Sequence, residues 1–240
     1  DAAVGPNLRM YRNSGSPADN DYIGEIQFEG RNDNSQDVVY AGLASRIVDA
    51  SDGTEDGRFE LYTSLAGAQI SRVLANSTET VINQDSVDLD FRVESNGNAN
   101  MLFVDGGNNR VGVGTNIPSV EFEIADSNSD CEMTIGSWAD NVNTKSALNF
   151  VKSRTATIGT GAATATNENI GEILAYGYDT GNTARTASQI LFMGDAAPDG
   201  DAVPGKILFK TSNASALQTA LTIDDGQIAT FGASVTAKTY

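Results

Sequence analysis

The chain has 240 residues, 40% of them hydrophobic, and a formal net charge of −17. So acidic a chain repels the phosphates of nucleic acids and anionic lipids, and neither is an expected partner. The sequence has no histidine and a single cysteine, Cys131, which excludes internal disulfides, Ser-His-Asp and Cys-His catalytic systems and every His-containing metal site. No apolar stretch approaches the roughly 20 residues of a membrane-spanning helix.

Short runs of alternating apolar and polar residues follow one another along the chain. Such alternation places apolar side chains on one face of a β-strand and polar ones on the other. Asp-Gly and Asn-Gly pairs, which are typical of tight hairpin turns, separate the runs. No convincing helix is present, and the best candidate, 38–48, reads equally well as a strand. The pattern predicts an all-β fold with strands at 26–29, 59–62, 89–94 and 120–124 and turns at 52–53, 56–57, 96–97, 105–109 and 225–226.

Four sequence blocks occur twice in the same order. A module that is repeated in series usually builds an extended object and not a cleft. The sequence therefore predicts an elongated, fibrous protein of two duplicated β-rich modules with a common strand order, in which Gly24 is equivalent to Gly171 and Gly57 to Gly205. The blocks are 8–13 with 148–153, 23–26 with 170–173, 57–64 with 205–212, and 102–105 with 221–224.

The repeat also predicts where the modules begin and end. Residues 1–125 form the first β module, which carries an extra stretch at about 77–100, residues 126–146 form a polar linker, and residues 147–240 form the second β module. The chain begins without methionine and ends without a clear terminating signal, so we expect a fragment of a longer or processed polypeptide.

No catalytic, cofactor-binding or metal-binding residue is expected, and the protein is predicted not to be an enzyme. Glu25 and Glu172 are the most tempting carboxylate pair for glycoside hydrolysis. They occupy equivalent repeat positions, however, so we expect each to face solvent or to pair across strands. The glycine-rich segments at 112–114 and 159–161 lack a dinucleotide or phosphate-loop pattern.

The sequence contains acidic stretches that partly resemble metal-binding loops. Residues 126–130 match the first ligands of an EF-hand loop, but Cys131 and Ser137 stand where glycine and glutamate are required. Acidic turns at 49–53 and 195–201 could hold calcium loosely, although solvated turns are favoured. Cys131 is expected to be unreactive in its acidic surroundings. Trp138 is expected to pack within the protein or to anchor a neighbouring chain.

Three segments carry a resemblance to known proteins. Residues 102–118 are similar to a segment of the form hydrophobic-Asp-Gly-Asn-Val-Gly-Ile-Gly-Thr-x-x-Pro, with Val113 in place of isoleucine. An Ile-Gly-Glu-Ile block followed by a Gly-(Arg/Lys)-x-x-(Leu/Phe)-x-Thr strand occurs twice, and 221–228 looks like a degenerate copy of the first segment. In this combination the chain resembles bacteriophage tail-fibre and virion-appendage proteins, especially those of marine phages.

The resemblance implies a β-rich homotrimeric rod in a virion appendage, in contact with other virion proteins and with a host-surface glycan or receptor. We expect a structural or adhesive tail-fibre component without catalysis. A capsid head fibre or decoration protein and a polysaccharide-degrading tailspike are the alternatives. Trimerisation is also plausible physically, because half-buried strands leave an apolar face and open edges that association would cover. Val111, Val113 and Ile117, spaced by glycines, suit a crowded trimer axis.

Overall fold

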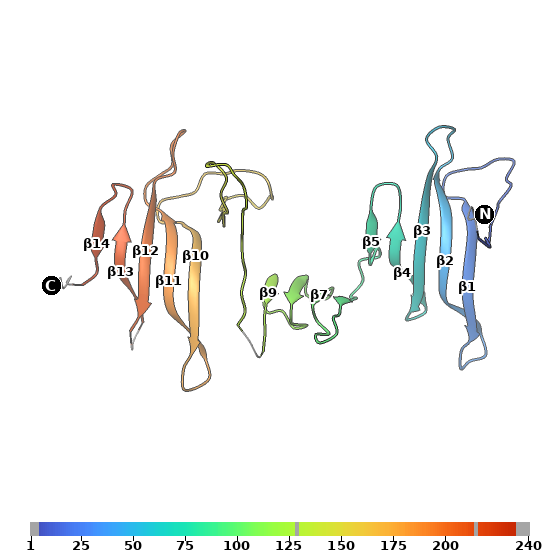
Figure 1. The fold of residues 1–240 in the computed structure, drawn as a ribbon, viewed down its shortest axis with the longest axis horizontal. Helices are drawn as coiled ribbons and strands as arrows, with labels where there is room; N and C mark the ends of the chain where they lie inside the picture. The colour runs from blue at the N-terminus through green and yellow to red at the C-terminus, as the bar shows by residue number, and fades with distance from the viewer. Residues whose placement is uncertain (1–4, 128–129, 214–215, 234–240) are drawn as a thin grey trace. The chain divides into compact units, whose positions relative to one another are not determined.

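The computed structural model describes residues 5–127, 130–213 and 216–233. Within these ranges every regular element is a β-strand (Figure 1), which confirms the predicted all-β fold class. The chain divides into two compact units, Asp1–Met133 and Thr134–Tyr240. The described residues contain no helix of the length and apolar character needed to cross a membrane. The homotrimer and the module boundaries at 125 and 147 stay predictions.

The first unit begins with a five-stranded antiparallel sheet. Its strands follow one another in chain order, so each pairs with its neighbour in sequence. They are β1 (Tyr22–Arg31), β2 (Asp37–Asp49), β3 (Asp56–Leu65), β4 (Ala68–Ala75) and β5 (Thr80–Ile82). The ambiguous segment 38–48 lies in β2 and is therefore a strand. Asp56 and Gly57 begin β3, so the turn predicted at 56–57 is wrong, and the turn before β3 contains Gly53 at a φ of 86°.

The first unit also contains a small four-stranded sheet. Its strands are β6 (Phe91–Val93), β7 (Leu102–Asp105), β8 (Arg110–Val113) and β9 (Phe122–Ile124), and β8 pairs with β9 in parallel. The predicted turn at 105–109 joins β7 to β8. Gly114 has a φ of 82°, and a Cβ there would lie 2.1 Å from the Ala125 carbonyl oxygen. Gly114, in the segment expected to suit a crowded trimer axis, is thus crowded by its own chain, and the place of this segment at such an axis stays a prediction.

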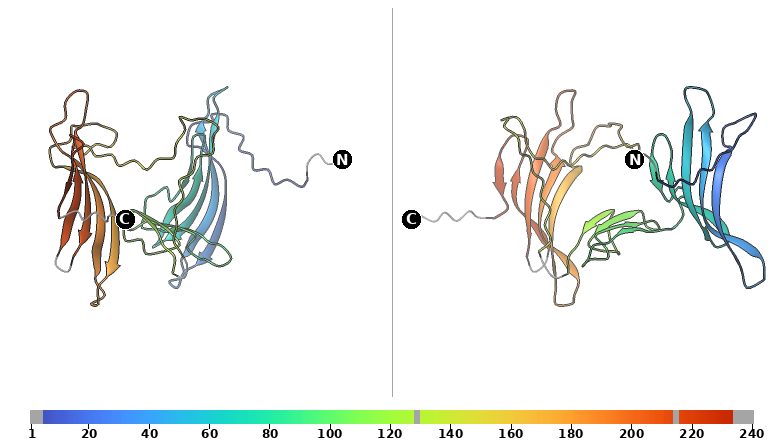
Figure 2. Two further views of the ribbon diagram at one scale, coloured as in Figure 1. Left: turned by 60° about the vertical axis from the view of Figure 1, so that its left-hand side comes forward. Right: turned by 45° about the vertical axis from the view of Figure 1, so that its right-hand side comes forward.

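The second unit contains the other five-stranded antiparallel sheet. Its strands again follow chain order, and Figure 2 shows each large sheet as a single twisted layer. They are β10 (Asn169–Tyr178), β11 (Ala184–Gly194), β12 (Gly205–Ser212), β13 (Leu217–Ile223) and β14 (Ala229–Phe231).

The two large sheets have the same strand order and nearly the same register. Gly24 pairs with Ser45, and Gly171, which is 147 residues later, pairs with Phe192. Each pair between β1 and β2 has its counterpart at this shift, including the two β-bulges. In β3 the shift becomes 148, since Gly57 pairs with Ile47 and Gly205 with Gly194. The predicted common strand order and glycine equivalences are confirmed, whereas descent from a duplicated module stays a prediction.

One of the four sequence echoes does not mark equivalent strands. Residues 221–223 lie in β13. The equivalent positions in the first sheet, by strand register, are Val73–Ala75 of β4. Residues 102–105 form β7, in the separate small sheet. This part of the prediction is wrong, because both segments open short β-hairpins and share hairpin chemistry without sharing a place in the sheet.

Candidate functional surface

A continuous apolar row crosses all five strands of the first sheet. Directly paired residues of antiparallel strands lie on the same face, so the row can be followed through the register. Ile26 pairs with Leu43, and Leu43 pairs in turn with Leu61. Leu61 pairs with Val73, and Val73 pairs with Ile82 at the opposite edge.

The second sheet repeats this row with other apolar residues. Its members, from β10 to β14, are Ile173, Ile190, Phe209, Leu221 and Phe231. We call the side of each sheet that carries its row the apolar face and the other side the polar face. No position in either row carries a polar side chain, so both sheets present an unbroken hydrophobic stripe from edge to edge.

The apolar face of each sheet is partly exposed, most strongly in the outer strands. Ile26 and Phe28 are 39% and 58% exposed, and Ile173 and Phe231 are 49% and 53% exposed. The buried residues in the described parts of the two large sheets lie on the polar face, except Gly194 at the end of β11, which shares the apolar face with Ile190 and Phe192. On the polar face they are Gly42, Ala44, Tyr62, Ser71 and Leu74 in the first sheet, and Leu191 in the second. A single chain therefore leaves the ends of its two apolar rows exposed and their middle members half-buried.

The total accessible surface of the chain is large for its mass. The 25.2 kDa chain exposes 17993 Å². Two separate compact units of about half that mass would together expose roughly 12,400 Å². The excess is several times the roughly 800 Å² that each partner buries in a standard protein–protein interface.

A segment that precedes each large sheet covers the edge of the apolar face. In the first unit Met10 lies over Gly24, and in the second Phe150 lies over Gly171. The Phe150 and Phe192 rings stack with centroids 5.8 Å apart. Beside them an apolar hollow of about 570 Å³ stays open. Its lining residues are Leu148, Asn149, Phe150, Val151, Ile170, Ile173 and Phe192.

The two candidate catalytic carboxylates, Glu25 and Glu172, accept hydrogen bonds from neighbouring side chains on the polar face. The Tyr62 hydroxyl donates a hydrogen bond to Glu25. Burial, and secondly this hydrogen bond, raises the pKa of Tyr62. In the second unit the side-chain amide of Gln189 donates to Glu172 at 2.5 Å. Each glutamate thus hydrogen-bonds across strands as expected, and the two lie in different units.

The acidic turns use their carboxylates to cap backbone groups. Asp49 accepts from the Ser51 N–H at 2.8 Å, and Asp199 accepts from the N–H groups of Asp201 and Ala202. These hydrogen bonds lower the pKa of both carboxyl groups. Among the described residues no three His, Cys, Asp or Glu side chains are grouped as metal ligands would be. The EF-hand-like stretch includes 128–129, which lie outside the described residues.

Cys131 and Trp138 both lie on the surface. The Cys131 thiol is exposed, and its Sγ donates a weak hydrogen bond to the Ile124 carbonyl at 3.3 Å. Trp138 is 90% exposed. The prediction that Trp138 packs within its own chain is therefore wrong, because the surrounding stretch of irregular backbone offers it no core. Its role as an inter-chain anchor stays a prediction.

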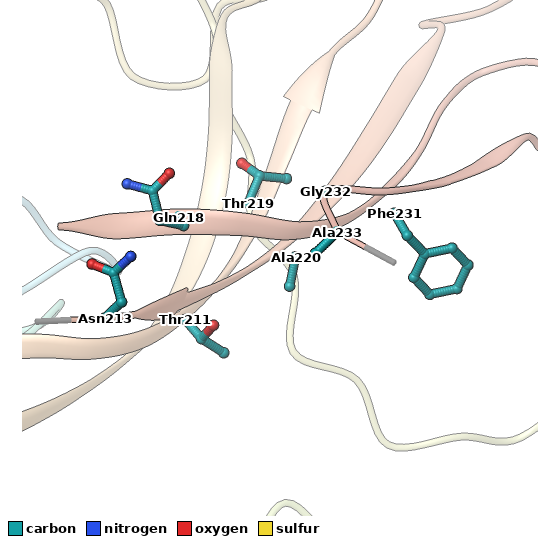
Figure 3. A pocket seen from close by; sticks show the side chains of 8 residues that line it. All are labelled: Thr211, Asn213, Gln218, Thr219, Ala220, Phe231, Gly232 and Ala233. Carbon is teal, nitrogen blue, oxygen red and sulfur yellow. The ribbon is translucent and has the colours of Figure 1, made fainter. Parts of the chain in front are cut away.

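The second sheet also contains a hollow of mixed polar and apolar lining beside β13 (Figure 3). It has a volume of about 560 Å³. The Phe231 ring points away from the amides of Asn213 and Gln218 (Figure 3), so these groups do not converge on one ligand position. The hollow is lined by Thr211, Asn213, Gln218, Thr219, Ala220, Phe231, Gly232 and Ala233.

Comparison with known proteins gives low-identity structural matches alone. No protein-family model matches the chain, and no curated protein matches it. The carboxy-terminal domain of the bacteriophage T5 L-shaped tail fibre matches with a TM-score of 0.45 and 12% identity, over 100% of this chain and 91% of that chain. The same domain with its intra-molecular chaperone domain matches with a TM-score of 0.45 and 11% identity, over 99% and 62%. Neither match assigns this chain to a family.

Proposed function

We propose that this chain is a structural segment of a bacteriophage tail fibre, in which three copies associate by burying their apolar faces against one another. The observation that carries the proposal is the pair of unbroken apolar rows, exposed at their ends and half-buried between them, on single-layer sheets. The tail-fibre-like segments at 102–118 and in the two repeated blocks supply the link to phage appendages. The proposed role is structural or adhesive and involves no catalysis.

A single chain has little core of its own, which supports association. The buried hydrophobic residues of the described chain are Ala44, Tyr62, Leu74, Phe103 and Leu191. At about 25 cal/mol per Å² of apolar surface removed from water, so small a set contributes little against the entropy of ordering more than two hundred residues. Association between copies buries the apolar rows and supplies the missing stabilisation.

The second reason for association is that both large sheets have open edges. In the first sheet β1 and β5 are the outer strands, and in the second they are β10 and β14. The sheets are thus open on one face as well as at their edges, and exposed edges favour pairing with other chains. Closed association of a fixed number of copies covers such surfaces and avoids open-ended aggregation.

The test is the mass of the folded assembly in solution. Sedimentation equilibrium and native mass spectrometry of the full chain should give three times the chain mass at all concentrations above the dissociation constant. A stable, well-ordered monomer would overturn the proposal. Antibody labelling of intact virions then locates the protein, and label on the capsid in place of the tail would favour the head-fibre alternative.

A further inference from the structure

A lysine, an asparagine and an aspartate of the second unit meet beside the start of β12. Lys206 Nζ donates a hydrogen bond to the side-chain carbonyl Oδ1 of Asn167 at 2.5 Å and to Oδ1 of Asp195 at 3.0 Å. The side chains of Lys206 and Asp195 are only 16% and 22% exposed. Alternation and turn patterns give no sign of this cluster, because its members are far apart in sequence.

The backbone holds the three residues in place. The Asn167 N–H donates to the carbonyl of Gly194, the residue before Asp195, at 2.8 Å. The Asp195 N–H donates to the Pro204 carbonyl at 2.9 Å, two residues before Lys206. Asn167 itself has a φ of 60°, so it stands in a turn. These backbone bonds hold the main chain of Asn167 and Asp195 near Lys206, and the two hydrogen bonds of Lys206 Nζ complete the cluster.

We propose that Lys206 and Asn167 join covalently, so that an isopeptide bond forms between the lysine Nζ and the asparagine Cγ and ammonia is released. All three residues belong to the second unit of one chain, so the proposal does not rest on trimer formation. The bond would tie the residues before β10 to β12, in a chain whose single cysteine rules out an internal disulfide.

Each step of this reaction balances within the cluster. The Asp195 carboxylate accepts a proton from the Lys206 ammonium, and the neutral amine attacks the Asn167 amide carbon. In the tetrahedral intermediate the attacking nitrogen passes one of its protons to the amide nitrogen, the C–N bond to that nitrogen breaks, and it leaves as ammonia. The proton held by Asp195 then passes to the ammonia, which departs as ammonium and regenerates the carboxylate. No oxidant or reductant is required, and the exposed side chain of Asn167 lets the product reach solvent.

The structure places the lysine nitrogen close to the amide carbon. A carbonyl bond is about 1.23 Å long, so the lysine nitrogen lies at most about 3.7 Å from the amide carbon. Reacting atoms held at about 3–3.5 Å gain effective concentrations of roughly 10⁵ M or more. Because the bond forms once in the life of each molecule, even a slow reaction is sufficient.

The first unit keeps the asparagine of this arrangement but lacks the lysine and the aspartate. Asn20 is the register equivalent of Asn167, with a φ of 69° and an N–H bond to the Ile47 carbonyl at 2.8 Å. Arg58 replaces the lysine and Val48 the aspartate, and both line one hollow with Asn20. A guanidinium stays protonated and does not attack an amide. The first unit is therefore an internal control in which no bond forms.

The test is the mass of the folded full chain after denaturation. We expect the chain to be lighter than its sequence mass by one ammonia molecule, and a protease digest to contain one peptide pair joined through Lys206 and Asn167. An unmodified mass after prolonged incubation of folded protein would overturn the proposal, and so would a digest with separate peptides. If the peptides are joined but the protein is a monomer, the proposed trimer is wrong and the proposed isopeptide bond is supported.

Three variants separate the isopeptide bond from other losses of ammonia. Lys206→Arg, which copies the first unit, and Asn167→Ala should both have their full sequence mass. Asp195→Asn should accumulate the bond at least tenfold more slowly, because it lacks the proton acceptor. If Lys206→Arg still loses ammonia, asparagine has cyclised on its own backbone and the proposal is wrong. The joined peptide of the unmodified chain decides the question even if a variant fails to fold.

Discussion

Phe150 packs over Gly171 so closely that a Cβ added to the glycine would lie 2.5 Å from both Cβ and Cγ of the phenylalanine. The contact ties the segment before the second sheet to the edge of its apolar face. In the first unit Met10 takes the same place over Gly24, with its Cε at 2.7 Å from the added Cβ. A ring close to its own backbone cannot move aside, whereas the end of a methionine side chain can.

Gly171→Ala should therefore destabilise the protein more than Gly24→Ala. Overpacking a closely fitted site costs about 1–3 kcal/mol, and we expect Gly171→Ala in that range and Gly24→Ala below it. The control is Gly177→Ala in the same strand, where the added Cβ has no neighbour within 4 Å. Urea unfolding midpoints measure all three, and equal losses in the two units would contradict the account of the contact.

Ile26→Lys should abolish trimer formation, whereas Gln27→Lys should preserve it. The two residues are adjacent in β1, both are exposed in a single chain, and they lie on opposite faces. Burial of three unpaired ammonium groups costs several kcal/mol each, in order of magnitude, so an assembly through the apolar face cannot tolerate the first change. Sedimentation velocity distinguishes the variants. A trimeric Ile26→Lys protein would show that another surface holds the copies together.

Tyr62→Phe should destabilise the first unit by about 1–2 kcal/mol at neutral pH, because the Glu25 carboxylate loses a hydrogen-bond donor. Burial and that hydrogen bond raise the pKa of Tyr62 above its ordinary value of 10.0. The stability that the hydroxyl contributes is complete below the unfolded-state pKa and is lost as the pH rises through the folded-state value. Melting temperatures followed to about pH 11 should show the unmodified protein losing its advantage over the variant. A constant difference would refute the assignment.

Asp179→Asn should remove an acid-sensitive contribution to stability and leave the turn between β10 and β11 intact. The pKa of Asp179 is lowered chiefly by the Thr183 N–H, then by Arg185 and Gly181. Its contribution is present above the unfolded-state pKa and is lost as the pH falls through the folded-state value.

The first unit already contains the matched residue for this test. Asn32 stands at the equivalent turn position and accepts the N–H groups of Asn34 and Gln36 at 3.1 and 2.8 Å. We expect Asp179→Asn to melt slightly below the unmodified protein at pH 7 and to converge with it on acidification. Melting curves between about pH 2 and pH 7 check this, and parallel curves would contradict it.

The folded protein should release no reducing ends from host-surface polysaccharide. Glu25 and Glu172 are the best carboxylate candidates for such activity, but each is hydrogen-bonded on a polar sheet face. Glu25→Gln and Glu172→Gln should each change stability by about 1 kcal/mol at most and produce no change in sugar release. Turnover that disappears in either variant would favour the tailspike alternative.

The sequence alone was sufficient for the fold class and for the equivalence of the two large sheets. Period-two alternation and Asp-Gly or Asn-Gly turns act over a few residues, so they show in a short window. The repeated Ile-Gly-Glu-Ile block located Gly24 and Gly171 at matching register positions for the same reason. Residues 102–105 and 221–224 share a hairpin-type sequence but lie in different kinds of sheet, so the sequence similarity led to a wrong equivalence.

Tertiary structure alone decided which residues share a face and which distant groups meet. The row from Ile26 to Ile82 depends on four strand pairings, and a slip of one residue in any of them would move side chains to the opposite face. The bulges in β1–β2 and β3–β4 set that register, and no residue pattern marks them. Likewise Lys206 meets Asn167, 39 residues away, only because long-range backbone pairing brings the turn before β10 beside the start of β12.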